Sequence, residues 1–457
     1  MPTAGPALDV GIRLNCFIDP ETTLGTRGAD LPAAADAVRL RGATGSIKVP
    51  TFVSEAKHGS TGQVTGGNEK ETASFSLEGY LDPAGSGTAP DVGPMLTSGG
   101  WTETIAGDDA VEAGSTTTTI NLTGHSYSAG EWVEINGDLV EITAKTANDI
   151  TVAPALSATP SASDAVTGAA AYTYNAARWD SQDSATVWLG NNRSLSCFIG
   201  ACLKKLSISL GGTGGGTWSA DFTARRGVLL GSSFLNGGIN DSVTTITVDD
   251  ASIVPSTVSA TEPWYLQIDD EVVKVIAKSG ADLTVDTRQS YGTGGIAASH
   301  SDNAVIFPYV PAGTYAGNHV SNTDGRVVAS ALVVASESTT VDIDMGIEDR
   351  APEHGDAYEF NGYVPKANGH EVGISTSLRM ETEGGMTVQL EALERAENPF
   401  YQQQGGTAGT IFALRAPTTL FEASDLDRGA DEVRAEMSGK GLISAAGSND
   451  AISLAFG

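Results

Sequence analysis

The sequence predicts an all-β protein from three observations: a duplicated strand-rich segment, runs of apolar residues that alternate with period two, and few helix signals. Residues 131–152 (EWVEINGDLVEITAKTANDITV) are similar, without a gap, to residues 264–285 (WYLQIDDEVVKVIAKSGADLTV). A strand signal precedes each copy, at residues 118–120 and 244–246. Such self-similarity indicates two copies of one small β domain that interrupt a larger host.

Alternating patterns predict further strands at residues 73–80, 206–210 and 218–223. The glycine-rich run 211–216 joins the last two, and we expect a hairpin tip there. A phosphate-binding loop would need a following helix and a Lys-Ser/Thr pair. Asn136-Gly137, between two strand patterns, is the strongest short hairpin signal, and Asp269-Asp270 takes its place in the second copy.

Helix signals are short. Residues 91–97 follow a proline, and residues 387–397 end at Asn398-Pro399, a favourable stop. The second pattern predicts that Val388, Leu390 and Leu393 face a core. C-terminal strands are expected near residues 327–334, 339–345, 371–380, 411–420, 431–438 and 451–456.

These patterns predict four domains. A first host module is expected to be discontinuous, at residues 1–104 and 169–233, and a second one to span residues 307–457. The inserted β domains are expected at residues 105–168 and 234–306, and both are expected to be barrel-like. Their insertion points favour exposed loop tips, because insertions are tolerated there.

Composition excludes several classes of protein. The chain has 457 residues, with 26 Lys+Arg against 56 Asp+Glu and a net charge of −30, which argues against a sequence-reading nucleic-acid binder. The three cysteines, Cys16, Cys197 and Cys202, form neither a disulfide framework nor a metal pattern, and the apolar run around Cys197 and Cys202 indicates buried thiols there. No apolar stretch approaches the length of a membrane span, and the start lacks the layout of a signal peptide.

No pattern assembles a catalytic, cofactor-binding or metal site, so we expect no enzyme activity and no cofactor. Three kinds of residue were candidates. Asp342 and Asp344 lack the other ligands of a calcium loop and are expected on one exposed strand face, and Glu391, Glu394 and Glu397 are expected on a solvated helix face. The histidines and tryptophans share no motif spacing: they are His58, His125, His300, His319, His354, His370, Trp101, Trp179, Trp188 and Trp218.

The host segments resemble the major tail tube proteins of long-tailed, non-contractile bacteriophages. The similarity lies in the order and pattern of residues 21–26, 37–48, 71–82, 94–101 and 184–227, and again in residues 344–350, 370–383, 397–404 and 449–457. It covers most of the host and neither repeat. Members of this family often have one tube module and sometimes one added immunoglobulin-like domain, whereas this chain is expected to have two of each kind.

The resemblance implies a structural virion protein that is assembled in the host cytoplasm and forms stacked rings. The family's ring usually has six modules, so two modules per chain predict a trimer with pseudo-sixfold symmetry; a hexamer is the alternative. The implied partners are the protein's own copies, a tape-measure protein, tail terminator and tail-tip proteins, and DNA that passes without specific binding. The acidity would keep DNA from adsorbing to the wall or would serve solubility alone.

Two expectations concern surface features. The long loop at residues 53–70 is expected to reach the next ring, since loops of this length are functional or disordered. The inserted domains are expected to be decoration or weak glycan binders. Two other classes remain open: an extracellular β-rich adhesin or surface-layer protein, and a polysaccharide-degrading enzyme, which would need a cleft with paired carboxylates.

Overall fold

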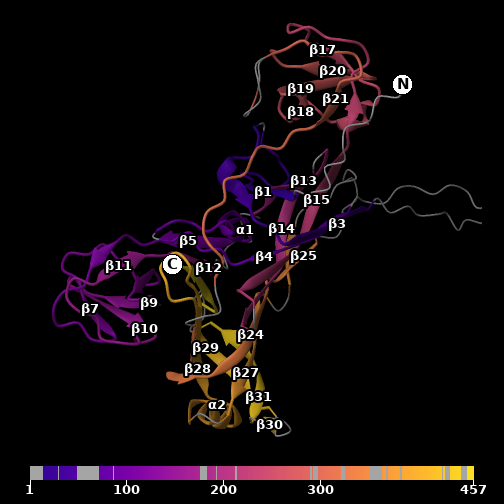
Figure 1. Cartoon of the computed structure of the whole chain (residues 1–457). Helices are drawn as coiled ribbons and strands as arrows, with labels where there is room; N and C mark the ends of the chain where they lie inside the picture. Colours follow the sequence, from indigo (N-terminus) through magenta and orange to yellow (C-terminus); the bar gives the residue numbers. More distant parts are fainter. Residues whose placement is uncertain are drawn as a thin grey trace, which may run out of the picture.

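Strands dominate the computed structural model of the chain, and the expected all-β fold class is confirmed (Figure 1). The structure describes residues 14–28, 30–48, 72–85, 87–174, 183–191, 193–211, 214–288, 291, 297–320, 325–349, 363–366, 369–380, 383–424, 426–427, 433–443 and 450–457. The expected ring-reaching loop at residues 53–70 lies outside these ranges.

An N-terminal strand set forms the first part of the host. Its elements are β1 (Leu14–Pro20), β2 (Ala37–Val38), β3 (Gly42–Lys48), β4 (Thr72–Tyr80), α1 (Gly93–Ser98), β13 (Ala185–Asn191), β14 (Ser194–Gly211) and β15 (Thr217–Leu230). Alternate residues of β4, such as Phe75 and Leu77, are buried, because successive side chains of a strand point to opposite faces.

A C-terminal strand set forms the second part. Its elements are β22 (Arg326–Ala329), β23 (Leu332–Val334), β24 (Ser336–Asp344), β27 (Glu371–Arg379), α2 (Glu383–Glu394), β28 (Glu397–Gln404), β29 (Phe412–Glu422), β30 (Leu426–Asp427) and β31 (Arg434–Leu442). A short hairpin is added by β25 (Ile347–Asp349) and β26 (Tyr363–Pro365).

The two sets repeat one pattern of antiparallel pairs. In the N-terminal set the pairs are β1–β2, β1–β13, β3–β4, β4–β15, β13–β14 and β14–β15. In the C-terminal set they are β22–β23, β22–β28, β24–β27, β27–β31, β28–β29 and β29–β31. Each pair in the first list has its counterpart in the second, in the same chain order.

A β-bulge fixes the correspondence residue by residue. The register of β13 with β14 shifts between Ala185 and Val187, just before Trp188. The register of β28 with β29 shifts between Asn398 and Phe400, just before Tyr401. A bulge adds one unpaired residue to one strand, so the shared bulge makes Trp188 and Tyr401 counterparts.

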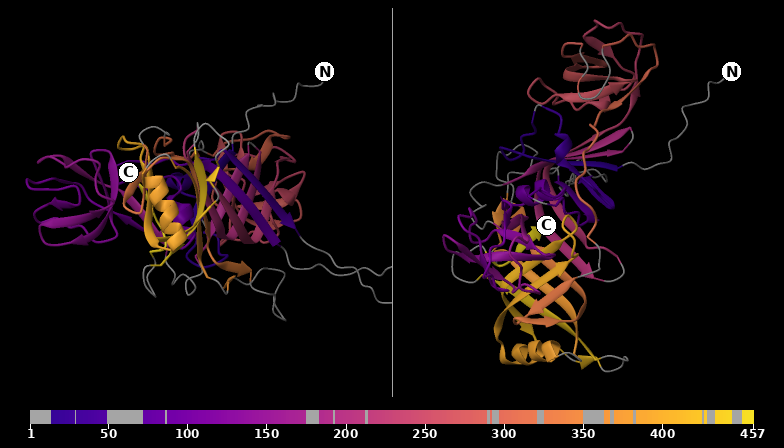
Figure 2. Two further views of the ribbon diagram at one scale, coloured as in Figure 1. Left: turned by 90° about the horizontal axis from the view of Figure 1, so that it is seen from below. Right: turned by 60° about the vertical axis from the view of Figure 1, so that its left-hand side comes forward.

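The two sets join edge to edge. Strand β14 pairs with β24 over seven residues, from Lys205 opposite Asp344 to Gly211 opposite Ser338. The strands therefore run in the order β3–β4–β15–β14–β24–β27–β31–β29 as one continuous sheet (Figure 2). A second connection between the two sets uses β5 (Trp101–Ile105), β12 (Ala170–Tyr174) and β32 (Ser453–Phe456). Strand β5 pairs with β12, and β32 pairs with both β12 and β29.

The duplicated segments form two six-stranded inserts with the same strand order. Insert 1 contains β6 (Asp109–Ala110), β7 (Thr119–Asn121), β8 (Trp132–Ile135), β9 (Asp138–Lys145), β10 (Asp149–Ala153) and β11 (Ala165–Gly168). Insert 2 contains β16 (Ser233–Phe234), β17 (Thr245–Thr247), β18 (Trp264–Ile268), β19 (Glu271–Ser279), β20 (Asp282–Val285) and β21 (Val305–Pro308). Both lie at the periphery of the molecule (Figure 1).

The two inserts dock on different strand sets, but at equivalent positions, Trp188 and Tyr401. Trp264 of insert 2 packs on Trp188, with ring centroids 5.7 Å apart. Insert 1 lies within the sequence of the first host part, yet its Trp132 stacks on Tyr401 of the C-terminal set, with ring centroids 6.4 Å apart. The predicted domain boundaries themselves stay a prediction.

Most expected strands occur, with three local corrections. Residues 327–334 are two strands, β22 and β23, because Ser330 and Ala331 adopt positive φ values of 55° and 62° and turn the chain back. Helix α2 ends at Glu394, so Asn398-Pro399 lies in β28. Leu390 and Leu393 are 53% and 65% exposed, whereas Val388 is buried.

Candidate assembly surfaces

One face of the continuous sheet is covered by small hydroxyl side chains. Neighbouring strands keep these residues in rows: Thr44 lies opposite Ser76, and Thr340 lies opposite both Ser209 and Ser375. The opposite face carries the core. The hydroxyl residues that are exposed or half-buried on this hydroxyl-rich face are Thr44, Ser46, Ser74, Ser76, Ser207, Ser209, Thr217, Ser219, Ser338, Thr340, Ser375, Ser377, Thr418 and Ser438.

Acidic side chains outnumber basic ones on the same face. The carboxylates are Glu78, Asp221, Asp342, Asp344, Glu371, Glu422, Asp427 and Glu436; the cations are Lys205, Arg379, Arg434 and Lys440, together with Arg41 and Lys366, which pair with Glu78 and Asp344 from beside the sheet. Asp342 and Asp344 do lie on one strand face, but each has its own cation: Lys205 at 3.1 Å and Lys366 at 2.6 Å. Burial alone would raise the pKa of Asp344, but hydrogen bonds from Lys366 and the Gly346 N–H lower it.

The sheet ends in two strands that each have one partner among the described residues. At one end β3 pairs only with β4. At the other end β30 continues the course of β29 and pairs only with β31, Leu426 opposite Ala435 and Asp427 opposite Arg434. Unpaired strand edges expose rows of backbone N–H and C=O groups that template further pairing.

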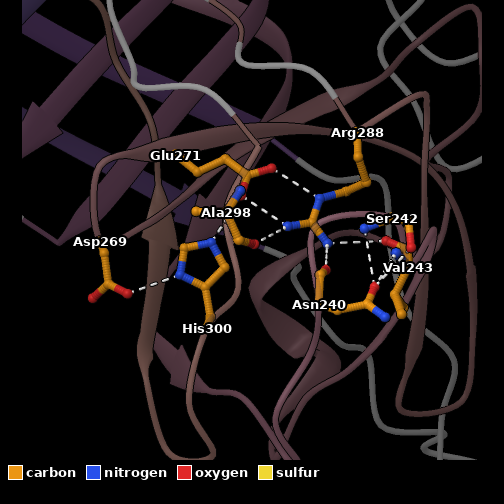
Figure 3. A network of polar contacts seen from close by, with 8 residues as sticks. All are labelled: Asn240, Ser242, Val243, Asp269, Glu271, Arg288, Ala298 and His300. Carbon is orange, nitrogen blue, oxygen red and sulfur yellow. Dashed lines mark hydrogen bonds and ion pairs between the residues drawn. The ribbon is translucent and has the colours of Figure 1, made fainter.

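A buried network of polar contacts lies in insert 2 (Figure 3). Both carboxylate oxygens of Glu271 accept hydrogen bonds from Arg288 at 2.8 Å, and His300 lies 2.8 Å from both Glu271 and Asp269. Arg288 also donates to the carbonyl oxygens of Asn240, Val243 and Ala298. These bonds hold the segment before β21 against the hairpin β18–β19 and so stabilise the fold of insert 2.

The pKa of Glu271 reflects this environment. Burial alone would raise it, but hydrogen bonds from Arg288, His300 and the Ala298 N–H lower it below the usual value. A carboxylate held in this way is neither a proton donor near neutral pH nor open to a substrate. The cluster is therefore not a catalytic candidate, and sequence spacing did not point to it.

The other candidate residues are packed or paired. The three cysteines are buried thiols that form no disulfide; burial raises the pKa of Cys197 to about 12 and also raises that of Cys16. Trp101, Trp188 and Trp218 are core residues. His319 contacts Asp82, and His370 stacks on Tyr174 with centroids 4.1 Å apart. His125 lies against Tyr127, whereas His58, His354 and Trp179 fall outside the described residues.

The carboxylates expected on a solvated helix face take different places. Glu394 is exposed at the end of α2 and Glu391 is half-buried, accepting a hydrogen bond from Asn398 at 3.0 Å. Glu397 begins strand β28 instead. Within the described ranges no group of His, Cys, Asp and Glu side chains could hold a metal ion.

A cavity of about 920 Å³ lies between insert 1 and the C-terminal set, beside Arg326, Tyr401 and Gln402. In the N-terminal set, the guanidinium of Arg27 lies 5.1 Å and 4.4 Å from the ring centroids of Trp188 and Trp264. Arg27 comes from the long connection between β1 and β2. In the C-terminal set, the guanidinium of Arg326 on β22 lies 5.4 Å from the ring centroid of Tyr401.

No protein-family model matches this chain, and no curated protein matches it either. No helix in the described parts of the chain has the length and apolar character needed to cross a membrane.

Proposed function

We propose that the chain is the building block of a self-assembling tube, the tail tube of a long-tailed, non-contractile bacteriophage. The observation that carries the proposal is the β14–β24 junction, where one strand set joins a copy of itself edge to edge within the chain. The same junction, repeated between chains, would use β30 and β3, the two end strands that each pair with one strand among the described residues.

The repeated pattern gives the register of that contact. In the internal junction, Ile208 and Ser209 of β14 lie opposite Val341 and Thr340 of β24. Leu426 and Asp427 of β30 match Ile208 and Ser209, because they take the same places relative to β31 as those residues take relative to β15. Gly45 and Thr44 of β3 match Val341 and Thr340. We therefore expect Leu426 opposite Gly45 and Asp427 opposite Thr44 of the next chain.

A head-to-tail contact of this kind either closes a ring or grows an open filament. Closing the sheet into a barrel leaves no free edge. Since each chain supplies two strand sets, a sixfold arrangement of sets needs three chains, and six chains are the alternative. Stacked rings would form the tube.

The hydroxyl-rich face is the proposed inner wall. Its side chains are short, and its carboxylates outnumber its cations. Double-stranded DNA binds proteins mainly through cations that displace its counterions, so an acidic, hydroxyl-covered wall lets DNA pass without adsorption. Both inserts dock at the other side of the strand sets, on Trp188 and Tyr401, and would decorate the exterior.

Sedimentation velocity of the purified full chain over a wide concentration range tests the proposal. Large species should form at the expense of the monomer, and a chain with Asp427→Pro should stay small, because proline removes a ladder donor at the joining edge. The matched control is Ser256→Pro, at an exposed turn position of insert 2. A monomer that persists at every concentration would contradict the proposal.

A further inference from the structure

The two strand sets differ in how their second strand is covered. Phe17 lies opposite both Trp188 and Ala37, and Val328 lies opposite both Tyr401 and Val333. Ala37 and Val333 are therefore counterparts. Ala37 is fully buried, whereas Val333 is 69% exposed. An exposed valine whose counterpart is buried indicates that the C-terminal set lacks a cover that the N-terminal set has.

The cover of the N-terminal set is the segment that leads from insert 2 into β22. Gly313 lies directly against Ala37, and the Thr314 N–H donates to the Ala34 carbonyl oxygen at 2.9 Å. Further along, the Asn318 and Val320 N–H groups donate to the carbonyl oxygens of Pro83 and Leu81 at 3.1 Å and 3.0 Å.

This cover requires a glycine and buries an apolar residue. Gly317 has φ +83°, and a Cβ there would approach the Pro83 carbonyl oxygen to 2.2 Å, so only glycine fits. Val320 is fully buried. The cover thus has a recognisable sequence: Ala316-Gly317, then two residues, then Val320.

The counterpart of the cover precedes β1, just as the cover precedes β22. Matching Phe17 with Val328 places Gly317 opposite Pro6, and a shift of one residue places it opposite Gly5. Residues 4–8 read Ala4-Gly5-Pro6-Ala7-Leu8, the same Ala-Gly followed by an apolar residue at the same spacing. These residues lie outside the described part of the chain.

We propose that residues 2–9 of a neighbouring copy lie across β23 and the start of α2, as residues 313–320 lie across β2 within the chain. This inference rests on the proposed self-assembly and deepens it by naming the segment and the surface. The surface is apolar: Leu332 and Met386 are 38% and 41% exposed beside Val333, and Gly384 of α2 lies against β23.

A neighbouring copy is the expected source of the segment. In Figure 1, β1 lies well away from α2, which lies at the end of the molecule opposite insert 2. In the proposed ring, by contrast, β3 of the next chain joins β30 of this one. That contact would place the neighbour's N-terminal strand set next to the C-terminal set of this chain, which carries β23 and α2. The two sets would then be arranged as they are at the internal β14–β24 junction.

The test places a photo-crosslinking amino acid at Val333 in the full chain and mixes equal amounts of isotopically heavy and light protein before irradiation. Residues 1–13 form one tryptic peptide, ending at Arg13, and residues 327–350 form another, ending at Arg350. We expect these two peptides to be joined, with mixed-isotope pairs as frequent as same-isotope pairs. The control carries the photo-crosslinker at Ala144, which is exposed on β9 of insert 1, and should not capture residues 1–13.

Deleting residues 2–9 gives a second readout. If Leu8 and its neighbours cover this apolar surface as proposed, their loss should raise the critical concentration for assembly by about tenfold. Large assemblies without the cross-link, or only same-isotope pairs, would overturn the inference and leave the tube proposal standing. A cross-link between copies that never exceed small oligomers would support the inference and contradict the tube. If the chain gives neither the cross-link nor large assemblies, that result contradicts both the inference and the tube proposal.

Discussion

Ser209 of β14 lies directly opposite Thr340 of β24, at the point where the two strand sets become one sheet. If the same junction forms between chains, Asp427 lies opposite Thr44 of the next copy. We predict that the variant with Asp427→Cys and Thr44→Cys forms disulfide-linked multimers under mild oxidation, because directly opposed residues have the Cα separation that a disulfide needs. Non-reducing gel electrophoresis checks the result.

The chain offers matched controls for this cross-link. Ser209→Cys with Thr340→Cys should give a disulfide within one chain and no multimers. Asp427→Cys with Ala43→Cys shifts the pair by one residue, and the two side chains would then point to opposite faces. Equal cross-linking of the shifted pair would contradict the proposed register.

Helix α2 yields a prediction about stability. Leu393→Ser should change the free energy of unfolding of the isolated chain by less than about 0.5 kcal/mol, because Leu393 is 65% exposed. Val388→Ala should lower the free energy of unfolding by about 2 kcal/mol, since Val388 lies on the buried side of the same helix. Urea denaturation measures both. A larger loss for Leu393→Ser than for Val388→Ala would mean that the helix is rotated from the orientation described.

The Glu271 cluster predicts a pH dependence of insert 2. The pKa of Glu271 is lowered in the folded protein, so its stabilising contribution is complete above the unfolded-state pKa of about 4.3 and is lost as pH falls through the lower folded-state value. Glu271→Gln should make the stability of insert 2 fall less steeply with decreasing pH. Limited proteolysis of insert 2 at a series of pH values measures this. Asp249→Asn, at an exposed position, should leave the fall as steep as in the unsubstituted chain.

The cysteines should be inert while the chain is folded. The thiolate is the reactive form of cysteine, and burial raises the pKa of Cys197 to about 12 and also raises that of Cys16. Iodoacetamide at pH 8 should therefore leave the native protein unlabelled and modify all three cysteines in urea, as mass spectrometry would show. Rapid labelling of the native chain would contradict the buried placement of Cys16, Cys197 and Cys202.

Local sequence signals predicted the strands well. Asn136-Gly137 turns the hairpin of β8 and β9 with φ values of 54° and 86°, because both positions of this turn type need positive φ. The turn at Ser330 and Ala331 was missed, since neither residue is a typical residue for positive φ. Leu390 and Leu393 were wrongly assigned to the core, because a periodic apolar stripe does not reveal whether its cover belongs to the same chain.

The assembly surfaces could not be predicted from local patterns. The β14–β24 junction joins strands that are far apart in the sequence, and backbone pairing leaves little trace in side-chain identity. The relation between the two strand sets is likewise visible in their shared pairings and in the bulges at Ala185 and Asn398, whereas their sequences show only a faint similarity. Glu271, Arg288 and His300 meet only because the loop before β21 folds back.

The most direct test of the central claim is negative-stain electron microscopy of the purified full chain at high concentration and several salt concentrations. The account predicts hollow filaments with a regular axial repeat, and end-on views with three chains and a pseudo-sixfold outline. Dispersed monomers under every condition, or aggregates without a lumen, would contradict it.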